Sequence, residues 1–345
     1  MNEFLSLSDE RRRLVFEQSA VRLNLAEIAI EKDFWVCMVL RTLFQLTGWG
    51  SSFTFKGGTS LSKGWKLIER FSEDIDIVID RVALDYPDAH TLDEGAGSSR
   101  RKRVLAGIKT ACREAVQDRI AGLLRTHLAA VLAGGLEWDL VSDESDPDGQ
   151  TLLFVYPSLF APLNRYVQQI VRIEMGARSD IEPTETVLIV PYIAEAFADL
   201  FDNAETPVRA VSPLRTFWEK ALLLHEEWHR PAGSRPRGAY MARHYYDLFR
   251  LIEAGVATRA VADLDLFARI VRHRSTFFRY GWIDYAALRK GSINLVPDAA
   301  HISGWESDYN RMRPEMFFGD VPTFARIMDA VRVFENQFNV TRRFQ

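Results

Sequence analysis

Residues 55–61, Phe-Lys-Gly-Gly-Thr-Ser-Leu, and residues 70–80, Arg-Phe-Ser-Glu-Asp-Ile-Asp-Ile-Val-Ile-Asp, decide the fold of this chain. In the second stretch isoleucines alternate with Asp74 and Asp76, and this period of two predicts a β-strand. The two carboxylates therefore point to the same side, where they repel each other unless a cation or a proton neutralises the pair. Mg²⁺ is the expected cation, with Mn²⁺ as a substitute, because carboxylate oxygens suit both ions. We assign Asp74 and Asp76 as metal ligands.

The first stretch supplies a turn suited to phosphate. A short apolar strand, Phe53 to Phe55, leads into Gly57-Gly58, and a helix is expected from Thr59 to Glu69. Backbone N–H groups where a glycine turn enters a helix form a phosphate cradle. The alternative is an ordinary strand-to-helix turn beside a solvated strand face, but the two halves in this order favour phosphate chemistry. The expected residues for binding a nucleoside triphosphate are Lys56, Gly57, Gly58, Thr59, Ser60, Lys63 and Ser72.

The composition sets limits without identifying a function. A chain of 345 residues can form one large or two medium domains. Its 47 acidic and 43 basic residues argue against a surface that binds polyanions everywhere and leave only local basic patches. Cys37 and Cys112 are too few for a disulfide scaffold or a cysteine-based zinc site. Because no apolar run approaches the roughly 20 residues of a membrane span, we expect a cytoplasmic protein that does not bind membranes.

Periodicity and turn residues predict an α+β fold. Ser8 suits the N-cap of a first helix, and Ser212-Pro213 gives an N-cap followed by proline at the first helical position. Short β-rich runs fill the middle of the chain. We place a domain boundary near residue 205, which separates domain 1–205 from a mainly helical domain 206–345. The predicted helices cover residues 8–23, 25–46, 100–133 and most of 213–338, and the later strands cover residues 151–156, 167–175 and 185–190.

The motif formed by residues 56–61 and 70–76 resembles the signature of the AbiEii/AbiGii-type toxins, which include the MenT toxins. This family is a branch of the DNA polymerase β-like nucleotidyltransferase superfamily. The run Ser-Glu-Asp-Ile-Asp is specific to the family, and residues 31–36 resemble its N-terminal helix. The resemblance implies a polymerase β-like core, a mixed sheet flanked by helices, in domain 1–205. It also implies that the helical domain 206–345 contributes to the active site and to RNA binding.

The resemblance also assigns roles to residues in later parts of the chain. In this superfamily a third acid on an adjacent strand completes the metal site or acts as a base, and Glu174 is the candidate. The alternative for Glu174 is an ion pair with Arg172 or Arg178. Lys220 matches the family's lysine motif, and a lysine can hold a triphosphate as a point charge. The alternative for Lys220 is a solvated helix face.

Asp247 matches the family's last aspartate motif, although His244 stands where the family has another aspartate. An aspartate can activate or orient the acceptor hydroxyl, so Glu174 and Asp247 are both candidate catalytic residues. From helical spacing alone, Asp247 would instead pair with Arg243 or Arg250.

Two basic segments are candidates for RNA binding. The first lies between the two helices that carry Lys220 and Asp247, and it contains arginines, prolines and glycines but no acid. The second interleaves arginines with aromatic residues, a combination that neutralises phosphates and stacks unpaired bases. A solvated helix face over core aromatics is the alternative for the second segment. The expected RNA-binding residues are Arg230, Arg235, Arg237, Arg243, Arg272, Arg274 and Arg279.

These features predict a nucleotidyltransferase that moves a nucleoside monophosphate from an NTP to an acceptor hydroxyl. The resemblance implies a toxin of a toxin–antitoxin or abortive-infection system that defends against phage. Its acceptor would be RNA, with the tRNA 3′ end expected because blocking it halts translation, and its partner would be a cognate antitoxin. One alternative acceptor is a hydroxyl of a small molecule or a protein. Another alternative is a regulator that binds nucleotide or RNA without turnover.

Overall fold

The computed structural model describes residues 1–72, 74–86, 92, 97–132, 135–160, 169–234 and 237–340. The chain divides into two compact units. Among the described residues, unit 1 comprises 1–64, 71–92 and 97–210, and unit 2 comprises 65–70 and 211–340. The segment Trp65–Arg70 therefore belongs to unit 2, although both of its neighbours in the sequence belong to unit 1.

Unit 1 is built on a mixed sheet, which in the described part of the chain has seven strands in the order β3-β4-β5-β2-β1-β7-β6. The central strand β2 pairs antiparallel with β1 and parallel with β5. As the alternation predicts, Ile75, Ile77 and Ile79 are buried, whereas Asp76 is partly exposed. The strands are β1 (Phe53–Lys56), β2 (Ile75–Ile79), β3 (Asp139–Ser142), β4 (Thr151–Val155), β5 (Ile170–Gly176), β6 (Thr184–Ile189) and β7 (Thr206–Val211).

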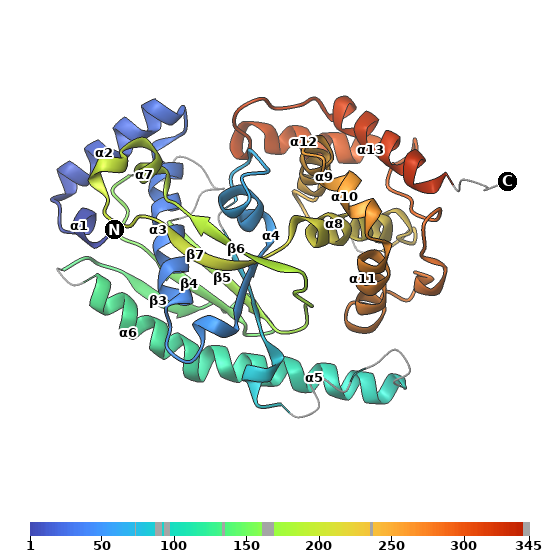
Figure 1. Ribbon diagram of the computed structural model, residues 1–345, viewed down its shortest axis with the longest axis horizontal. Helices are drawn as coiled ribbons and strands as arrows, with labels where there is room; N and C mark the ends of the chain where they lie inside the picture. Colours follow the sequence, from blue (N-terminus) through green and yellow to red (C-terminus); the bar gives the residue numbers. More distant parts are fainter. Residues whose placement is uncertain are drawn as a thin grey trace. The chain divides into compact units, whose positions relative to one another are not determined.

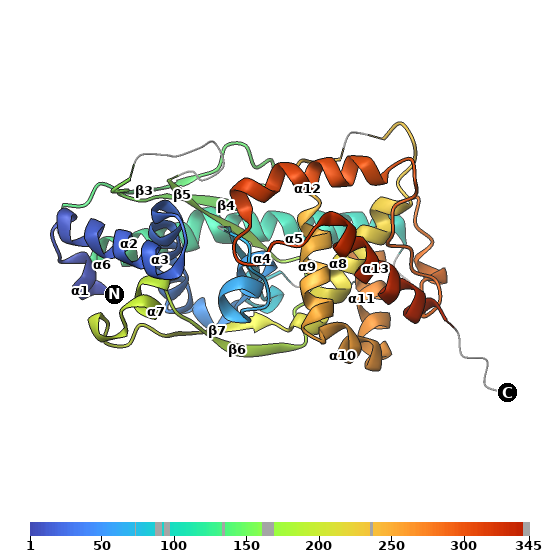
Figure 2. The same ribbon diagram turned by 90° about the horizontal axis from the view of Figure 1, so that it is seen from above.

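Helices of unit 1 lie beside this sheet (Figure 1). Helix α3 (Glu27–Phe44) buries most of its side chains, and both α3 and α5 (Ser98–Glu114) contact β5. Helix α5 continues through a π-helical segment, η5 (Ala115–Ile120), into α6 (Ala121–Val131), so that one long helix runs along the unit (Figures 1 and 2). This mixed sheet with flanking helices confirms the predicted α+β class. The remaining helices of unit 1 include α1 (Asn2–Leu5), α2 (Asp9–Leu23) and α7 (Tyr192–Ala196).

The helix predicted over residues 59–69 is wrong beyond Gly64. The chain forms one helical turn, α4 (Gly57–Thr59), and a π-helical turn, η2 (Ser60–Gly64), and then leaves helical geometry. Lys66 has a left-handed φ of 52°. The backbone of Glu69 bonds within unit 2, where its N–H donates to Tyr246 Oη (3.1 Å) and its carbonyl accepts from Phe318 N (3.2 Å). These tertiary bonds replace the helical ones that the apolar spacing predicts.

Unit 2 is mainly helical in the described residues, but residues 278–301 form a long connection that contains only the 3-10 helix η7 (Tyr285–Ala287). Its first helix, α8, begins as predicted, because Ser212 Oγ accepts from Leu214 N and Pro213 occupies the first turn. A core of aromatic rings includes Trp218, Phe267, Phe334 and Phe338. The helices are α8 (Pro213–Trp228), α9 (Arg243–Glu253), α10 (Val256–Ala262), α11 (Leu264–Phe277), α12 (Ile302–Met316) and α13 (Phe324–Asn339).

The other predicted elements are close to those observed. The helix predicted from Ser8 is α2, and Ser8 Oγ accepts a bond from Arg11 N. The strands predicted at 151–156, 167–175 and 185–190 correspond to β4, β5 and β6, although residues 167 and 168 lie outside the described residues. Strands β3 and β7 are not among those predicted. Among the described residues, no helix combines the length and the apolar character that a membrane span requires.

Candidate active site

The glycine turn and the second aspartate of the motif are in direct contact within unit 1. Gly57 has a φ of +78°, and a Cβ at this position would lie 1.9 Å from Asp76 Oδ2. Lys56 pairs with Asp76 across the β1–β2 ladder, which sets the carboxylate at the start of the turn. A side chain at residue 57 would collide with the carboxylate, so only glycine fits. The Gly57 turn and the Asp76 carboxylate are therefore packed directly against each other.

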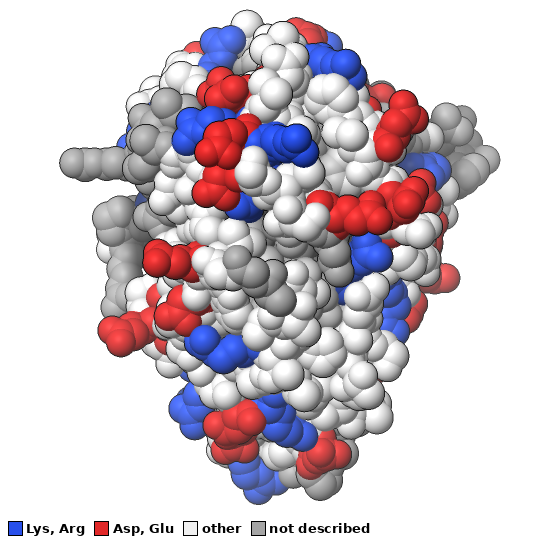
Figure 3. Space-filling model, turned by 90° about the vertical axis from the view of Figure 1, so that its left-hand side faces the viewer, with Lys and Arg blue, Asp and Glu red and all other residues white. Residues whose placement is uncertain are grey.

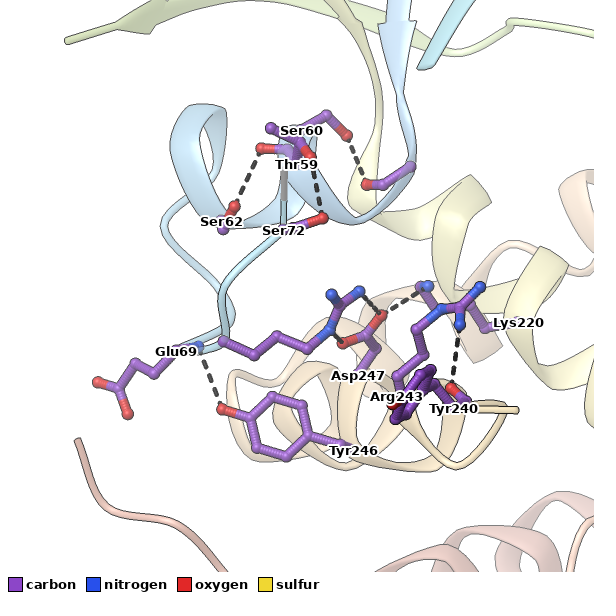
Figure 4. Close-up of polar contacts among 12 residues, drawn as sticks. Thr59, Ser60, Ser62, Glu69, Ser72, Lys220, Tyr240, Arg243, Tyr246 and Asp247 are labelled. Atoms are coloured by element: carbon purple, nitrogen blue, oxygen red, sulfur yellow. Dashed lines mark hydrogen bonds and ion pairs between the residues drawn. The ribbon is translucent and has the colours of Figure 1, made fainter. Parts of the chain in front are cut away.

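Hydroxyl groups hold this turn in place (Figure 4). Thr59 Oγ1 donates to the carbonyl oxygen of Asp74 (2.6 Å) and lies 2.9 Å from Ser72 Oγ, while Ser60 Oγ donates to the carbonyl oxygen of Gly57 (2.9 Å). Thr59 and Ser60 are fully buried. Their hydroxyls are therefore engaged in fixing the turn against β2. Of the residues predicted to bind phosphate, Gly57, Gly58 and Ser72 are partly exposed, whereas Thr59 and Ser60 are not.

The acids of β2 and β5 share one face of the sheet. Asp76 is opposite Glu174 in the parallel β2–β5 register. Arg172 Nε donates to Glu174 Oε1 (2.8 Å), and Arg172 also pairs with Asp143. Burial alone would lower the pKa of Arg172, but Glu174, Asp143 and Asp74 outweigh it and raise the pKa. The ion pair of Glu174 with Arg172, the alternative from sequence, is thus present, and Glu174 is still half exposed.

The donor set at β2 fits a cation held by two carboxylates. Among the described residues, no three side chains of histidine, cysteine, aspartate or glutamate gather into a group that could hold a metal ion. Asp74 and Asp76 remain, two residues apart at the start of β2. Mg²⁺ is commonly bound by one or two carboxylates and completes its shell with water and substrate phosphates. The residues present therefore fit Mg²⁺ in that mode.

The contacts of Lys63 indicate a role in packing. Its Nζ lies 2.8 Å from Asp33 Oδ1 on α3 and 3.5 Å from the centre of the Tyr192 ring. Asp33 also accepts from Tyr192 N at 2.7 Å. Burial opposes the charged ammonium, but Asp33 outweighs it and raises the pKa of Lys63. Lys63 thus anchors η2 to α3, whereas Lys56 is partly exposed and donates to Ser179 Oγ (3.1 Å).

A buried ionic cluster occupies unit 2 (Figure 4). Asp247 is fully buried on α9, and Arg70 binds it through two bonds, from Nε to Oδ1 (2.7 Å) and from Nη2 to Oδ2 (2.8 Å). Lys220 Nζ on α8 lies 2.7 Å from Oδ2 of the same carboxylate. Burial alone would raise the pKa of Asp247, but Arg70 and Lys220 outweigh it and hold the pKa well below the ordinary value. The carboxylate therefore stays ionised and is a weak base.

The partners that helical spacing predicts for Asp247 are wrong. Arg243 donates to the carbonyl oxygen of Tyr240 (3.0 Å), and Arg250 pairs with Glu69 (3.0 Å) and Glu253 (3.5 Å). The solvated alternative for Lys220 is also wrong, because its side chain is 9% exposed. Sequence reasoning missed Arg70, although it opens the signature, because no local pattern links it to a residue 177 positions later.

Next to this cluster, His244 is neutral. Burial lowers the pKa of its imidazole well below the ordinary value, and Lys220 and Arg243 add to the effect. The family aspartate that His244 replaces would bring a negative charge to this place. The cluster of Arg70, Lys220, Asp247 and His244 is therefore poorer in negative charge than the family pattern implies.

The arginines predicted to bind RNA differ in availability. Arg274 forms a buried pair with Glu226 (2.8 Å), and Arg230 pairs with Glu227 (2.9 Å). Arg272 and Arg279 are exposed, and Arg237 lies over the Trp305 ring. Arg235 lies outside the described residues. On the face drawn in Figure 3 acidic and basic side chains are interspersed, which agrees with the net charge of −4.

The sequence matches the family model described as "Nucleotidyl transferase AbiEii toxin, Type IV TA system" over residues 39–332. The chain belongs to the AbiEii toxin family. This confirms the resemblance read from residues 56–76 and makes the protein a nucleotidyltransferase toxin of a type IV toxin–antitoxin system, a class that implies an antitoxin partner. Enzymes of the AbiEii family generally use an NTP and a divalent metal ion.

Among solved structures, this AbiEii chain is similar to MenT4, a nucleotidyltransferase toxin from Mycobacterium tuberculosis H37Rv. The identity is 20% and the TM-score 0.47, over 98% of this chain and 91% of that chain. No curated protein matches the sequence.

Proposed function

We propose that this AbiEii toxin is a Mg²⁺-dependent enzyme that transfers a nucleoside monophosphate from an NTP to RNA, with the tRNA 3′ end as acceptor. The contact between Gly57 and the Asp76 carboxylate carries the proposal, because it joins a phosphate-binding turn to a metal-binding acid. Family membership supports the nucleotidyltransferase reaction, and the tRNA acceptor is the further step that the resemblance of residues 56–76 suggests. Blocking tRNA ends in the cytoplasm would halt translation during phage infection, and a cognate antitoxin would prevent this in uninfected cells.

On the donor side, the backbone of the Gly57 turn and Ser72 would bind the triphosphate, and Asp74 and Asp76 would hold the metal ion. When bound, the ion neutralises phosphate charge and stabilises the oxygens of an in-line displacement. The close approach of the Gly57 backbone restricts the positions that the Asp76 carboxylate can take. Thr59 and Ser60 keep the turn rigid from within. Lys63 maintains the packing of η2 on α3.

Two residues compete for the role of general base, and their environments favour Glu174. Asp247 is fully buried, both of its oxygens are bonded, and its pKa is held low. Glu174 is 46% exposed and opposite Asp76 in the sheet. A general base must reach the acceptor proton and accept it. We therefore assign the base to Glu174 and a positioning role to Asp247.

Asp247 positions Lys220 within unit 2. Among the described residues, Asp247 is the one ion-pair partner of Lys220, and it engages a single N–H of the ammonium. A lysine carries three N–H donors, so the others remain able to bind a phosphate oxygen. Lys220 is thus the candidate for steadying the nucleotide or the departing pyrophosphate.

The test is transfer of label from each of the four NTPs to total tRNA. The purified protein with Mg²⁺ is expected to label RNA at the 3′ end, and EDTA should abolish the reaction. Asp76→Asn should reduce labelling by about a thousandfold or more, as expected when transition-state charge stabilisation is lost. Asp265→Asn, which removes an exposed acid on α11, is the matched control and should label normally.

Two results would refute parts of this proposal. Label that appears on a small molecule or a protein, and never on RNA, would refute the tRNA acceptor. It would support a hydroxyl of a small molecule or a protein as the acceptor instead. Equal labelling by the wild type and Asp76→Asn would refute the assignment of Asp74 and Asp76 as metal ligands.

A further inference from the structure

Unit 2 contains a pocket in which none of the catalytic candidates takes part. It has a volume of about 300 Å³ and lies at the end of α8, against the following loop and α12. This volume is at the lower end of the range for small-molecule pockets, roughly 300–1,000 Å³, so one nucleotide unit fits but a duplex does not. The side chains that matter for recognition are Glu227, Trp228, Arg230, Arg237, His301 and Trp305.

Arg237 presents a guanidinium with open donors. Its guanidinium carbon lies 3.5 Å from the centre of the Trp305 ring, and Trp305 is itself buried against Tyr245 in an edge-to-face contact of 4.8 Å. Within the described part of the chain, Arg237 makes no hydrogen bond and no ion pair. A guanidinium stacked on a fixed ring keeps its planar fork available for phosphate oxygens.

The acids of the pocket already have hydrogen-bond partners. Arg230 Nη1 donates to Glu227 (2.9 Å), and His301 Nδ1 lies 2.6 Å from Asp298. Arg230 Nε is buried and has no hydrogen-bond partner in the described structure, which adds a second unsatisfied donor. A metal-bound triphosphate needs carboxylates that can hold the ion, whereas Glu227 and Asp298 each already engage a neighbouring side chain. The pocket therefore suits a phosphodiester rather than the NTP donor.

Trp228 provides a surface for a base. Its ring is 44% exposed, and its Nε1 donates to the carbonyl oxygen of Val296 (3.0 Å), so the ring is held although it is accessible. Unpaired bases stack on such aromatic faces regardless of their identity.

We propose that this pocket binds one unpaired nucleotide of the RNA acceptor, with Arg237 on its phosphate and Trp228 stacked on its base. The inference rests on the proposed RNA acceptor and assigns that RNA a place on unit 2. It concerns binding before transfer, so it can be tested without NTP or metal.

The experiment measures fluorescence anisotropy of a short labelled single-stranded RNA with the full-length protein over a range of salt concentrations. Arg237→Gln should raise the Kd about tenfold, and it should reduce the slope of log K against log salt by about 0.7, because one phosphate contact is lost. Trp228→Ala should raise the Kd about tenfold and leave the slope unchanged, because it removes stacking. Arg259→Gln, an exposed arginine on α10 outside the pocket, is the charge-matched control and should change neither quantity.

If Arg237→Gln does not fold, Arg237→Lys serves instead, since it keeps the charge and the salt slope but loses the fork and part of the affinity. Unchanged RNA affinity in a folded Arg237 variant would refute the proposal that this pocket binds RNA. It would leave the proposed transfer reaction unaffected. Binding that depends on Arg237 in a protein that never labels RNA would support the pocket and refute the proposed transfer. Displacement of the RNA by an NTP without metal would assign the pocket to free nucleotide and overturn the inference.

Discussion

At the scale of single residues, Gly57 and Asp76 depend on each other. The carboxylate occupies the space in which any other residue at 57 would place its Cβ, and the positive φ of Gly57 is a conformation that other residues adopt at a cost. The Gly57 turn can therefore not change independently of the Asp76 carboxylate. A substitution at this glycine tests the site without touching a charged group.

The Gly57→Ala variant should be both less stable and less active than the wild type. The left-handed conformation costs on the order of 1–3 kcal/mol, and relief of the clash must move Asp76. A displacement of about 1 Å can reduce the rate about a hundredfold. Urea unfolding and the tRNA-labelling rate would measure both effects.

Gly122→Ala is the matched control. Gly122 lies in α6, and a Cβ there would meet no atom within 4 Å. This variant should keep full activity and gain up to about 1 kcal/mol, as expected for glycine replaced in a helix interior. Normal activity in Gly57→Ala would show that the turn does not set the position of the acid.

At the scale of elements, the buried cluster of Arg70, Lys220 and Asp247 connects three parts of unit 2. Arg70 comes from the segment 65–70, Lys220 from α8 and Asp247 from α9. Such a cluster is weak evidence for stability in itself, since the desolvation of three charges opposes their attraction. Removal of one member, however, leaves the others buried without a partner. The cluster therefore fixes the geometry of Lys220.

Asp247→Asn should destabilise the protein by about 3–5 kcal/mol, because it leaves Arg70 and Lys220 buried without a countercharge. The folded-state pKa of Asp247 lies below its unfolded value, so its contribution is complete above the ordinary carboxyl pKa of about 3.9 and is lost as the pH falls below it. The stability gap to the wild type should thus be constant from about pH 7 to about pH 5 and narrow at lower pH.

Glu253→Gln, also in α9, is the control with which the stability loss of Asp247→Asn is compared. Glu253 forms half-exposed ion pairs with Arg250 and Arg326, which contribute about 1 kcal/mol or less. Urea unfolding of both variants over this pH range checks the prediction. A loss for Asp247→Asn no larger than that for Glu253→Gln would show that the cluster is not coupled to folding.

The elements that sequence predicts well are those with local signals. The alternating isoleucines of β2, the Ser8 cap of α2 and the Ser212-Pro213 start of α8 each depend on neighbours a few residues away. The end of the helix at Gly64 was missed because the bonds of Glu69 to Tyr246 and Phe318 are distant in sequence. Asp74, Asp76 and the glycine turn are close in sequence, so the sequence predicts them as a unit. Arg70 and Asp247 are 177 positions apart, so the sequence does not predict their pairing.

At the scale of the whole molecule, the small net charge of −4 limits how RNA can be bound. A protein with mixed surface charge has no long-range field that attracts polyanions from all sides. In the proposed reaction, recognition would come from sites such as the Arg237 pocket, where a stacked guanidinium could bind a phosphate. This argues for selection of unpaired RNA ends over binding along duplexes, which the phosphate backbone dominates.

Induced expression of the wild-type chain in bacteria without its antitoxin should stop translation before it stops transcription or replication. A tRNA whose 3′ end carries an added nucleotide has lost the free 3′ hydroxyl of its original terminal ribose and no longer ends in the nucleotide that aminoacylation requires, so protein synthesis is the first process to lack its substrate. Pulse labelling with methionine, uridine and thymidine would follow the three processes, and sequencing of tRNA 3′ ends would detect the added nucleotide. Asp76→Asn, expressed at the same level, should leave growth unchanged, because it keeps the fold but removes a metal-binding carboxylate. Growth arrest by Asp76→Asn, or a fall in uridine incorporation before that of methionine, would contradict tRNA transfer as the basis of toxicity.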